Sequence, residues 1–305
     1  MRVSYVSPQL AAILRERVIG DLSLDFLVDV AAVGIADLDS ADALLVMAIN
    51  QANILPLTRD PAARRRYGDL ASPAPDTERR PVSISAIADS LGLPFETARR
   101  HIHRLRARGA CELEAGGVIV PAAFLSSPAY LASVMQVYGR LRSFHHELQA
   151  LGVLRPLPEP AFPLEGEGLM RGAARLVSDY LLRVAAGVVR IAGDRVAALA
   201  LLGAAAGGTE RPGLTAEGLL RPGVRRPVRP AELSRRLRLP PETTRRQLLR
   251  LTREGVVART PSGFMVTEEM LAGRAWRAVL RANAGDVQRL FDGLAVRGVI
   301  ALWQT

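Results

Sequence analysis

A stretch of 40 residues occurs in two similar copies, at 81–120 and at 227–266, separated by a constant 146 residues without a gap. The matched positions include Pro81 and Pro227, Thr97 and Thr243, Arg100 and Arg246, Gly109 and Gly255, and Gly117 and Gly263. The same offset continues to Gly152 and Gly298. A repeat of this length predicts a fold built from two copies of one supersecondary arrangement.

Composition predicts a folded, mainly α-helical protein. Of the residues, 49% are apolar and 23% are charged, as in a folded globular protein. The length of 305 residues leaves room for two domains that each bury a core. Strand-forming residues are sparse outside two short places. The most apolar windows, 27–54 and 181–206, both contain charged side chains. Because a bilayer span needs about 20 nearly uncharged residues, we expect buried helices there and no membrane partner.

Each copy of the repeat has the pattern of two short helices joined by a tight turn. In the first copy, Ile84, Ile87, Ala88 and Leu91 are spaced as the buried face of a helix, and residues 92–94 interrupt it. A second helix is expected to run from about Pro94 to Arg108. Its inner face is expected to comprise Ala98, Ile102 and Leu105, matched by Thr244, Leu248 and Leu251 in the second copy. These helices therefore present a polar outer face.

Two short strands are expected after each helix pair. Residues 111–113 and 118–120 would form the first hairpin, and residues 256–259 and 264–266 the second. The second hairpin carries Arg259, which could contact a phosphate. The first carries Glu112 and Glu114 in this region. We therefore expect the first hairpin to bind DNA less strongly, or to serve another purpose.

The strings LGLPFETARRHIHRLRARGA and LRLPPETTRRQLLRLTREGV resemble the winged helix-turn-helix family of bacterial transcriptional regulators. The order of elements in each repeat is similar to that of the MarR type, in which terminal helices form a dimer interface. This resemblance implies a single-chain pseudo-dimer. Its two recognition helices would enter successive major grooves of one duplex, roughly 34–36 Å apart.

We therefore expect a mainly α fold of two tandem repeats, each an apolar helical bundle plus a winged helix-turn-helix with a small β-wing. The first repeat would span 1–155, and the second 156–305, with the stretch 154–168 as the linker. The first would contain helices within 8–55, a winged helix-turn-helix at 81–121 and a closing helix at 128–151. The second would contain helices within 169–206, a winged helix-turn-helix at 227–267 and a closing helix at 268–297. The stretches 56–80 and 207–226 are expected to be irregular.

The predicted DNA-binding residues lie on the outer faces of the second helices and on the second hairpin. Thr97 and Thr243 fall in the first turn, where a hydroxyl and backbone N–H groups can hold a phosphate. Arg100 and Arg246 lie slightly deeper and could make bidentate contacts to guanine. The full predicted set is Thr97, Arg99, Arg100, Arg104, Thr243, Arg245, Arg246, Arg250 and Arg259.

Positive charge is concentrated on the two repeated stretches. The chain has a formal net charge of +10, and all 40 basic residues are arginine. Residues 79–108 contain 7 Arg and 2 acids, and residues 221–259 contain 12 Arg and 3 acids. This pattern is typical of nucleic-acid binding. The pairs Arg79–Arg80 and Arg225–Arg226 are either contacts to the DNA backbone or ordinary solvated loop residues.

No catalytic pattern is recognisable, so we expect no enzyme, no cofactor and no metal. His101 and His103 are two residues apart on a helix and do not share a face, which argues against a shared metal. The single cysteine, Cys111, is expected to be a small buried residue, and one cysteine permits no disulfide framework. The expected location is the cytoplasm, in association with the nucleoid.

The leading hypothesis is a sequence-specific regulator that binds double-stranded DNA through both repeats. The alternative is an architectural or replication-type scaffold, with one winged helix on DNA and the other on a protein partner. The neutral first half, with 16 Arg and 16 acids in residues 1–152, favours this alternative. A third reading, a purely protein-binding tandem winged helix as in condensin-associated subunits, disagrees with the focused charge. A small-molecule effector, RNA polymerase and another regulator are further candidate partners.

Overall fold

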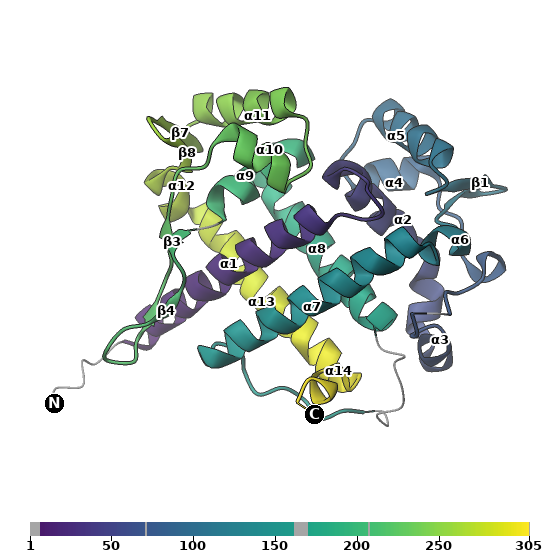
Figure 1. The fold of residues 1–305 in the computed structure, drawn as a ribbon, viewed down its shortest axis with the longest axis horizontal. Helices are drawn as coiled ribbons and strands as arrows, with labels where there is room; N and C mark the ends of the chain where they lie inside the picture. The colour runs from purple at the N-terminus through teal and green to yellow at the C-terminus, as the bar shows by residue number, and fades with distance from the viewer. Residues whose placement is uncertain (1–6, 71, 162–169, 207, 305) are drawn as a thin grey trace. The chain divides into compact units, whose positions relative to one another are not determined.

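The computed structural model describes residues 7–70, 72–161, 170–206 and 208–304 (Figure 1). This part of the chain is mainly helical and contains four small antiparallel sheets of two strands each. Residues 162–168 of the expected linker lie outside the described residues, as does residue 169, where the helices of the second half were expected to begin.

The elements follow in chain order. The helices are α1 (Pro8–Val33), α2 (Ser40–Arg59), α3 (Pro61–Arg66), the 3₁₀ helix η1 (Asp76–Glu78), α4 (Ile84–Ser90), α5 (Phe95–Ala107), α6 (Ala122–Leu125), α7 (Pro128–Ala150), α8 (Met170–Ala192), α9 (Arg195–Ala205), α10 (Pro230–Arg236), α11 (Pro241–Arg253), α12 (Glu268–Ala272), α13 (Arg274–Val296) and α14 (Val299–Leu302). The strands are β1 (Glu112–Glu114), β2 (Gly117–Ile119), β3 (Gly208–Glu210), β4 (Gly213–Leu214), β5 (Leu220–Arg221), β6 (Val224–Arg225), β7 (Val257–Thr260) and β8 (Gly263–Val266).

The chain forms two compact units, and neither is a continuous half of the sequence. Unit 1 consists of Met1–Ala32, Arg140–Pro158 and Arg183–Asp292. Unit 2 consists of Val33–Gly139, Glu159–Leu182 and Gly293–Thr305. The expected boundary between residues 155 and 156 falls inside a segment of unit 1. Each unit therefore combines residues from both halves of the sequence.

In unit 1, the helix α9 forms the base on which α10, α11 and the strand β8 pack (Figure 1). Every residue from Ala197 to Ala205 is buried, because neighbours cover this apolar helix on all faces. At Gly203, an added Cβ would lie 2.1 Å from Leu233 Cδ1, so the missing side chain lets α10 approach closely. The aromatic rings of Phe26 and Phe144 stack elsewhere in this unit at 4.7 Å between centroids.

In unit 2, the helix α2 occupies the corresponding place, in contact with α4 and β2 (Figure 1). Buried apolar side chains from α2, α5 and β2, among them Ile49, Ile102, Leu105 and Val118, form one core. Within this core lies a fully buried polar side chain, Asn53. Its Nδ2 donates to the carbonyls of Arg80 and Val118, and its Oδ1 accepts from the N–H of Val120. Asn53 thus ties α2 to the hairpin.

Residues 82–119, here named the N-terminal helix–hairpin segment, and residues 228–266, the C-terminal helix–hairpin segment, have matching local structure. The bounds of α4 and α5 differ by 146 residues from those of α10 and α11, and the bounds of α7 differ by 146 from those of α13. In each segment a residue before the first helix bridges to the second strand, Val82 to Val118 and Val228 to Phe264.

A glycine is required beside each bridge. Gly117 and Gly263 have φ angles of 145° and 148°, which L side chains rarely adopt. An added Cβ would lie 2.3 Å from the Val82 carbonyl oxygen in the first segment, and 2.4 Å from that of Val228 in the second. The two glycines therefore allow each hairpin to approach the backbone of the valine that precedes the first helix, Val82 or Val228.

The stretch 56–80, expected to be irregular, contains helices. The helix α2 continues through Pro56 to Arg59, whereas the expected helices ended at residue 55. Asp60 then caps α3 by accepting from the Ala62 N–H, and Pro61 occupies the first turn, where its missing N–H costs nothing. A small cluster of Ala63, Tyr67 and Ala74 stabilises this extension by burial.

The stretch 207–226 was also expected to be irregular, and its described part is a β-ribbon. β3 pairs with β6 and β4 pairs with β5, both antiparallel. The turn at its end uses Gly218 with φ at 77°. Pairing between the strands defines the ribbon, and the sequence of this stretch has no clear apolar alternation that would predict strands.

The closing helix of the first half matches its expected range, since α7 ends at Ala150 and Gly152 follows with φ at 60°. The expected closing helix at 268–297 is instead divided at Gly273 into α12 and α13. The cause is extended backbone at Gly273, with φ −64° and ψ 145°, which cannot continue a helix.

Candidate nucleic-acid interface

The helices α5 and α11 begin in the same way and bury the same face. Pro94 and Pro240 precede them with identical dihedral angles, φ −57° and ψ 135°, and neither has a side chain that caps the helix. The first N–H groups of each helix thus lack a side-chain cap. The predicted inner positions are confirmed as buried: Ala98, Ile102 and Leu105 on α5, and Thr244, Leu248 and Leu251 on α11.

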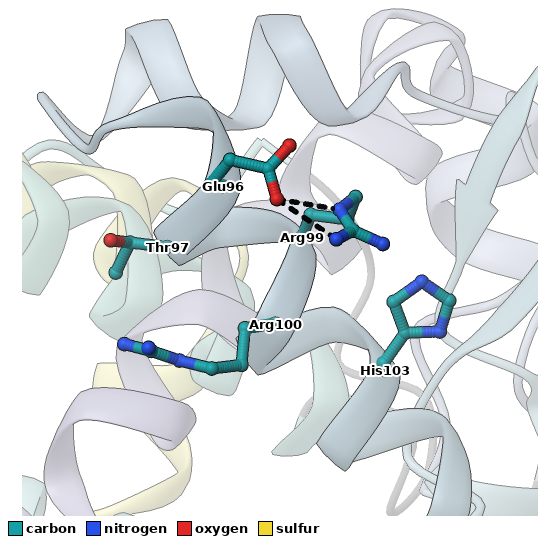
Figure 2. Close-up of a pocket in the computed structure, with 5 residues that line it drawn as sticks. All are labelled: Glu96, Thr97, Arg99, Arg100 and His103. Atoms are coloured by element: carbon teal, nitrogen blue, oxygen red, sulfur yellow. Dashed lines mark hydrogen bonds and ion pairs between the residues drawn. The ribbon is translucent and has the colours of Figure 1, made fainter.

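The outer face of α5 forms a shallow, open hollow lined by Glu96, Thr97, Arg99, Arg100 and His103 (Figure 2). Figure 2 shows Thr97 and Arg100 projecting toward the same side of the helix, with the Glu96–Arg99 pair on the other side. His103 lies further along the helix. The structure therefore places three of the predicted DNA-binding residues, Thr97, Arg99 and Arg100, around one accessible hollow.

Arg99 and Arg245 each form an ion pair within their own helix. The distance is 2.9 Å from Arg99 Nη2 to Glu96 Oε2, and 3.0 Å from Arg245 Nη2 to Glu242 Oε1. The hydrogen bond and charge of Arg245 lower the pKa of Glu242. All four side chains are about half exposed or more, and exposed pairs contribute little to stability. These arginines can therefore exchange their carboxylate for a phosphate at small cost.

Arg100 and Arg246 differ from their neighbours because both are exposed and neither forms a hydrogen bond or ion pair with any described residue. Each lies one position after an arginine that is paired. Two guanidinium groups at equivalent positions of the two segments are thus available to a partner. Thr97 and Thr243, three residues earlier in each helix, are partly exposed.

Arg104 and Arg250, also predicted to bind DNA, contact acids at the start of α2 and of α9 respectively. Arg104 Nη2 lies 2.6 Å from Asp42 Oδ2 and 3.5 Å from Asp39 Oδ2. Arg250 Nη2 lies 2.9 Å from Asp194 Oδ2 and also donates to the Ala192 carbonyl. These pairs join residues about 60 positions apart in sequence, so helical periodicity gave no sign of them. They fix each outer helix to the helix behind it.

Asp42 is the most buried of these acids, with a side chain 1% exposed. It accepts hydrogen bonds from Arg104 Nε at 2.9 Å and from His101 Nδ1 at 2.8 Å. Burial alone would raise its pKa, but the hydrogen bonds from His101 and Arg104 bring the pKa below the ordinary value of 3.8. Such a carboxylate stabilises the fold at any pH above 3.8, and this contribution is lost as pH falls through the lowered pKa.

We therefore expect Asp42→Asn to lower the free energy of unfolding at neutral pH by about 1.5–3 kcal/mol, the usual contribution of a hydrogen bond to a charged group. The deficit should begin to shrink once pH falls below 3.8, because the unfolded chain then takes up a proton at Asp42, and it should disappear as pH falls through the lowered pKa of the folded state. Urea unfolding at a series of pH values measures both effects. Asp89→Asn, an exposed acid on α4, is the control and should behave as wild type. A deficit that does not change with pH would contradict this role of the charge.

Arg259, the last predicted residue, is exposed on β7. Its counterpart 146 positions earlier is Leu113, which is 39% exposed and flanked by the exposed Glu112 and Glu114. The two hairpins therefore present different chemistry, one with a cation and the other with two carboxylates beside an apolar side chain.

Three of the four arginines that precede the helices are occupied, whereas Arg80 is exposed and its side chain forms no hydrogen bond or ion pair with a described residue. Arg79 is buried, and it donates to the Ala74 carbonyl and to Asn50 Oδ1. Arg225 Nη2 lies 2.8 Å from Asp21 Oδ1, and Arg226 Nη2 lies 2.5 Å from Glu232 Oε1. The prediction that Arg79 is either a backbone contact or a solvated loop residue is therefore wrong, because its guanidinium is enclosed by the fold.

The remaining expectations concern Cys111, metal binding and membrane spans in the described part of the chain. Cys111 is buried, and burial raises the pKa of its thiol to about 12, so it is protonated at neutral pH. Over the same part of the chain, no three His, Cys, Asp or Glu side chains lie together as a metal site requires. None of the helices described is long and apolar enough to cross a bilayer.

Known proteins give no further guide to this interface. No protein-family model matches the chain, and neither a curated protein nor a solved structure is significantly similar to it.

Proposed function

We propose that this chain is a sequence-specific double-stranded DNA-binding transcriptional regulator, with no catalytic activity. The observation that carries the proposal is the shared outer face of α5 and α11. Both helices present Glu, Thr and two consecutive Arg at matching positions, and in both the second arginine, Arg100 or Arg246, is exposed without a hydrogen bond or ion pair to a described residue. Packing does not require this pattern to occur twice.

In this proposal the two helix–hairpin segments are winged helix-turn-helices, and α5 and α11 are the recognition helices. The equal spacing of their helices, bridges and positive-φ glycines supports an origin by duplication and a pseudo-dimeric arrangement. The order of helices, hairpin and closing helix resembles that of MarR-type regulators. Each recognition helix would enter a major groove.

The contacts on the helix faces suggest a division of roles. Thr97 and Thr243, with the uncapped N–H groups of the first turn, would hold a phosphate. Arg99, Arg245 and Arg259 would neutralise further phosphates, while Arg100 and Arg246 would contact base edges. Arg104 and Arg250 would act indirectly, because their ion pairs to Asp42 and Asp194 fix the angle of each helix.

The test is binding of the full chain to random duplexes and to duplexes selected from genomic DNA, over a range of salt concentrations. We expect selection of a paired motif with half-sites about one helical turn apart, since each repeat would contact one half-site. The logarithm of the affinity should fall linearly with the logarithm of salt concentration, with a slope of about −0.9 per neutralised phosphate. Weak binding that selects no sequence would rule out the regulator.

A scaffold with one segment on DNA and the other on a protein is the second candidate. The exposed Glu112, Leu113 and Glu114 on β1 favour it, because this hairpin would repel a phosphate. Arg100→Ala and Arg246→Ala, tested singly in the full chain, separate the two functions. The regulator requires both to weaken DNA binding, whereas the scaffold requires only Arg246→Ala to do so.

A further inference from the structure

Unit 2 contains a small cavity with an unusual concentration of buried arginine. It lies among α2, α6, α7, α8 and the residue Arg79, which precedes α4. The polar side chains that line it are Asn50, Arg79, Tyr130, Arg171, Arg175 and Ser178. Arg79 and Arg171 are each only 4% exposed. Charged side chains are rarely buried to this extent unless they are paired.

The three guanidinium groups are held mainly by neutral acceptors. Arg171 donates from Nε to the Asp69 carbonyl and from Nη2 to the carbonyls of Leu70 and Leu125. Arg175 donates from Nη2 to the Tyr67 carbonyl at 2.9 Å. These backbone contacts fix the arginines in place but do not neutralise their charge.

Further donor atoms remain on each group. No hydrogen bond to a described residue involves Nη2 of Arg79, Nη1 of Arg171, or Nε and Nη1 of Arg175. None of these atoms is among the fully buried side-chain atoms that lack a hydrogen-bond partner. Each atom is therefore accessible from solvent or from the cavity. The cavity is therefore lined by hydrogen-bond donors, and the amide oxygen of Asn50 already accepts a hydrogen bond from Arg79.

The local charge is positive. Among the described residues, one carboxylate forms an ion pair with the three arginines, that of Asp76, at 3.4 Å from Arg79 Nε, and the charge of Asp69 also acts on Arg171. Burial lowers the pKa of Arg79 and Arg171, and burial together with the charge of Arg171 lowers the pKa of Arg175 to about 10. All three remain protonated at neutral pH. Uncompensated buried charge is costly, and a bound anion would remove most of that cost.

We propose that this cavity binds one chloride-sized monovalent anion. The cavity leaves about 10 Å³ for the centre of a water-sized sphere and is partly open to solvent, so it is close to the size of a single water-sized occupant. Burial raises the pKa of Tyr130, so its hydroxyl keeps its proton. This hydroxyl is a neutral hydrogen-bond donor for the anion, in addition to the three guanidinium groups. The site is independent of DNA binding.

The experiment measures the stability of the full chain at neutral pH while chloride replaces the anion of a bulky sulfonate salt at constant ionic strength. The free energy of unfolding should rise with chloride as one-site binding requires. In Arg175→Gln, the affinity for chloride should fall by about 10- to 100-fold, as expected for the loss of one hydrogen bond to a charged group. The variant keeps the side chain long and polar, and among the described residues it removes one hydrogen bond, that to the Tyr67 carbonyl.

Arg195→Gln is the matched control. Burial also lowers the pKa of Arg195 to about 10, but this residue lies in unit 1 and outside the cavity, so the chloride response should equal that of the wild type. If Arg175→Gln does not fold, Tyr130→Phe removes only the hydroxyl and should weaken chloride binding several-fold. Bromide in crystals of the wild type should give an anomalous peak among the three guanidinium groups.

Three results would overturn the proposal. The first is an equal response to chloride in the wild type and in Arg175→Gln, which would indicate a general salt effect. The second is the absence of a bromide peak in the cavity. The third is stronger stabilisation by acetate than by chloride, which would assign the site to a carboxylate ligand.

Discussion

The double substitution Arg100→Ala/Arg246→Ala is expected to reduce the specific affinity for the selected duplex by about 2–6 kcal/mol. Each bidentate contact to a base contributes about 1–3 kcal/mol of discrimination, and the two helices present one such arginine each. Neither side chain forms a hydrogen bond or ion pair with a described residue, so its removal should leave the fold intact. Fluorescence anisotropy with the selected and a random duplex measures the loss of specific binding separately from the loss of general binding.

Arg59→Ala/Arg277→Ala is the control for net charge. Both residues are exposed arginines outside the helix–hairpin segments, on α2 and α13, and the double variant lowers the net charge equally. It should weaken binding to both duplexes slightly and to a similar degree, through the long-range field alone. If the two double variants lose the same amount of specific affinity, the helix faces are not the readout surface.

The second large effect concerns stability. Asn53→Leu should lower the free energy of unfolding by about 3–5 kcal/mol, because each buried polar group left without its partner costs about 1–3 kcal/mol. The amide of Asn53 serves three backbone groups, the carbonyls of Arg80 and Val118 and the N–H of Val120. The Val118 carbonyl still accepts from the Val82 N–H, so the largest cost should come from the Val120 N–H, which loses the acceptor that Asn53 provides. Urea unfolding with an unchanged m-value would report the loss.

Gln51→Leu on the same helix is the matched control. It replaces an amide by the same apolar side chain, but the Gln51 amide makes a single hydrogen bond to a described residue, the Arg175 carbonyl at 2.6 Å, and Gln51 is only partly buried. The expected loss is about 1 kcal/mol. If Asn53→Leu also lowered the free energy of unfolding by less than about 1 kcal/mol, then other groups or water would be forming hydrogen bonds with the backbone groups that Asn53 serves.

Much of the helical pattern follows from local chemistry. The apolar spacing of Ala98, Ile102 and Leu105 predicts which face of α5 is buried, because one face of a helix repeats every three to four residues. Gly152 predicts the end of α7, since the left-handed conformation there favours glycine. The extension of α2 through Pro56 was not predictable from propensity, because burial in a tertiary cluster stabilises it.

The candidate interface was predictable in part. The identity and spacing of Thr97, Arg99 and Arg100 place them on the exposed part of α5, and in the structure all three line one hollow. Periodicity alone could not tell Arg100, which has no partner among the described residues, from Arg104, which pairs with Asp42. That distinction depends on a contact between residues 62 positions apart. The arginine cavity likewise joins α2, α7 and α8, whose proximity no local pattern reveals.

The sequence by itself determined the offset of 146 residues, the helix pairs, their buried stripes and the concentration of arginine on them, because these depend on residue order and local geometry. The tertiary structure alone decided which arginines are occupied and which remain available. It also decided that the compact units draw on both halves of the chain. The physical reason is that ion pairing and burial depend on distance in space, and only packing brings Asp42 to Arg104, or Arg79 to Arg171.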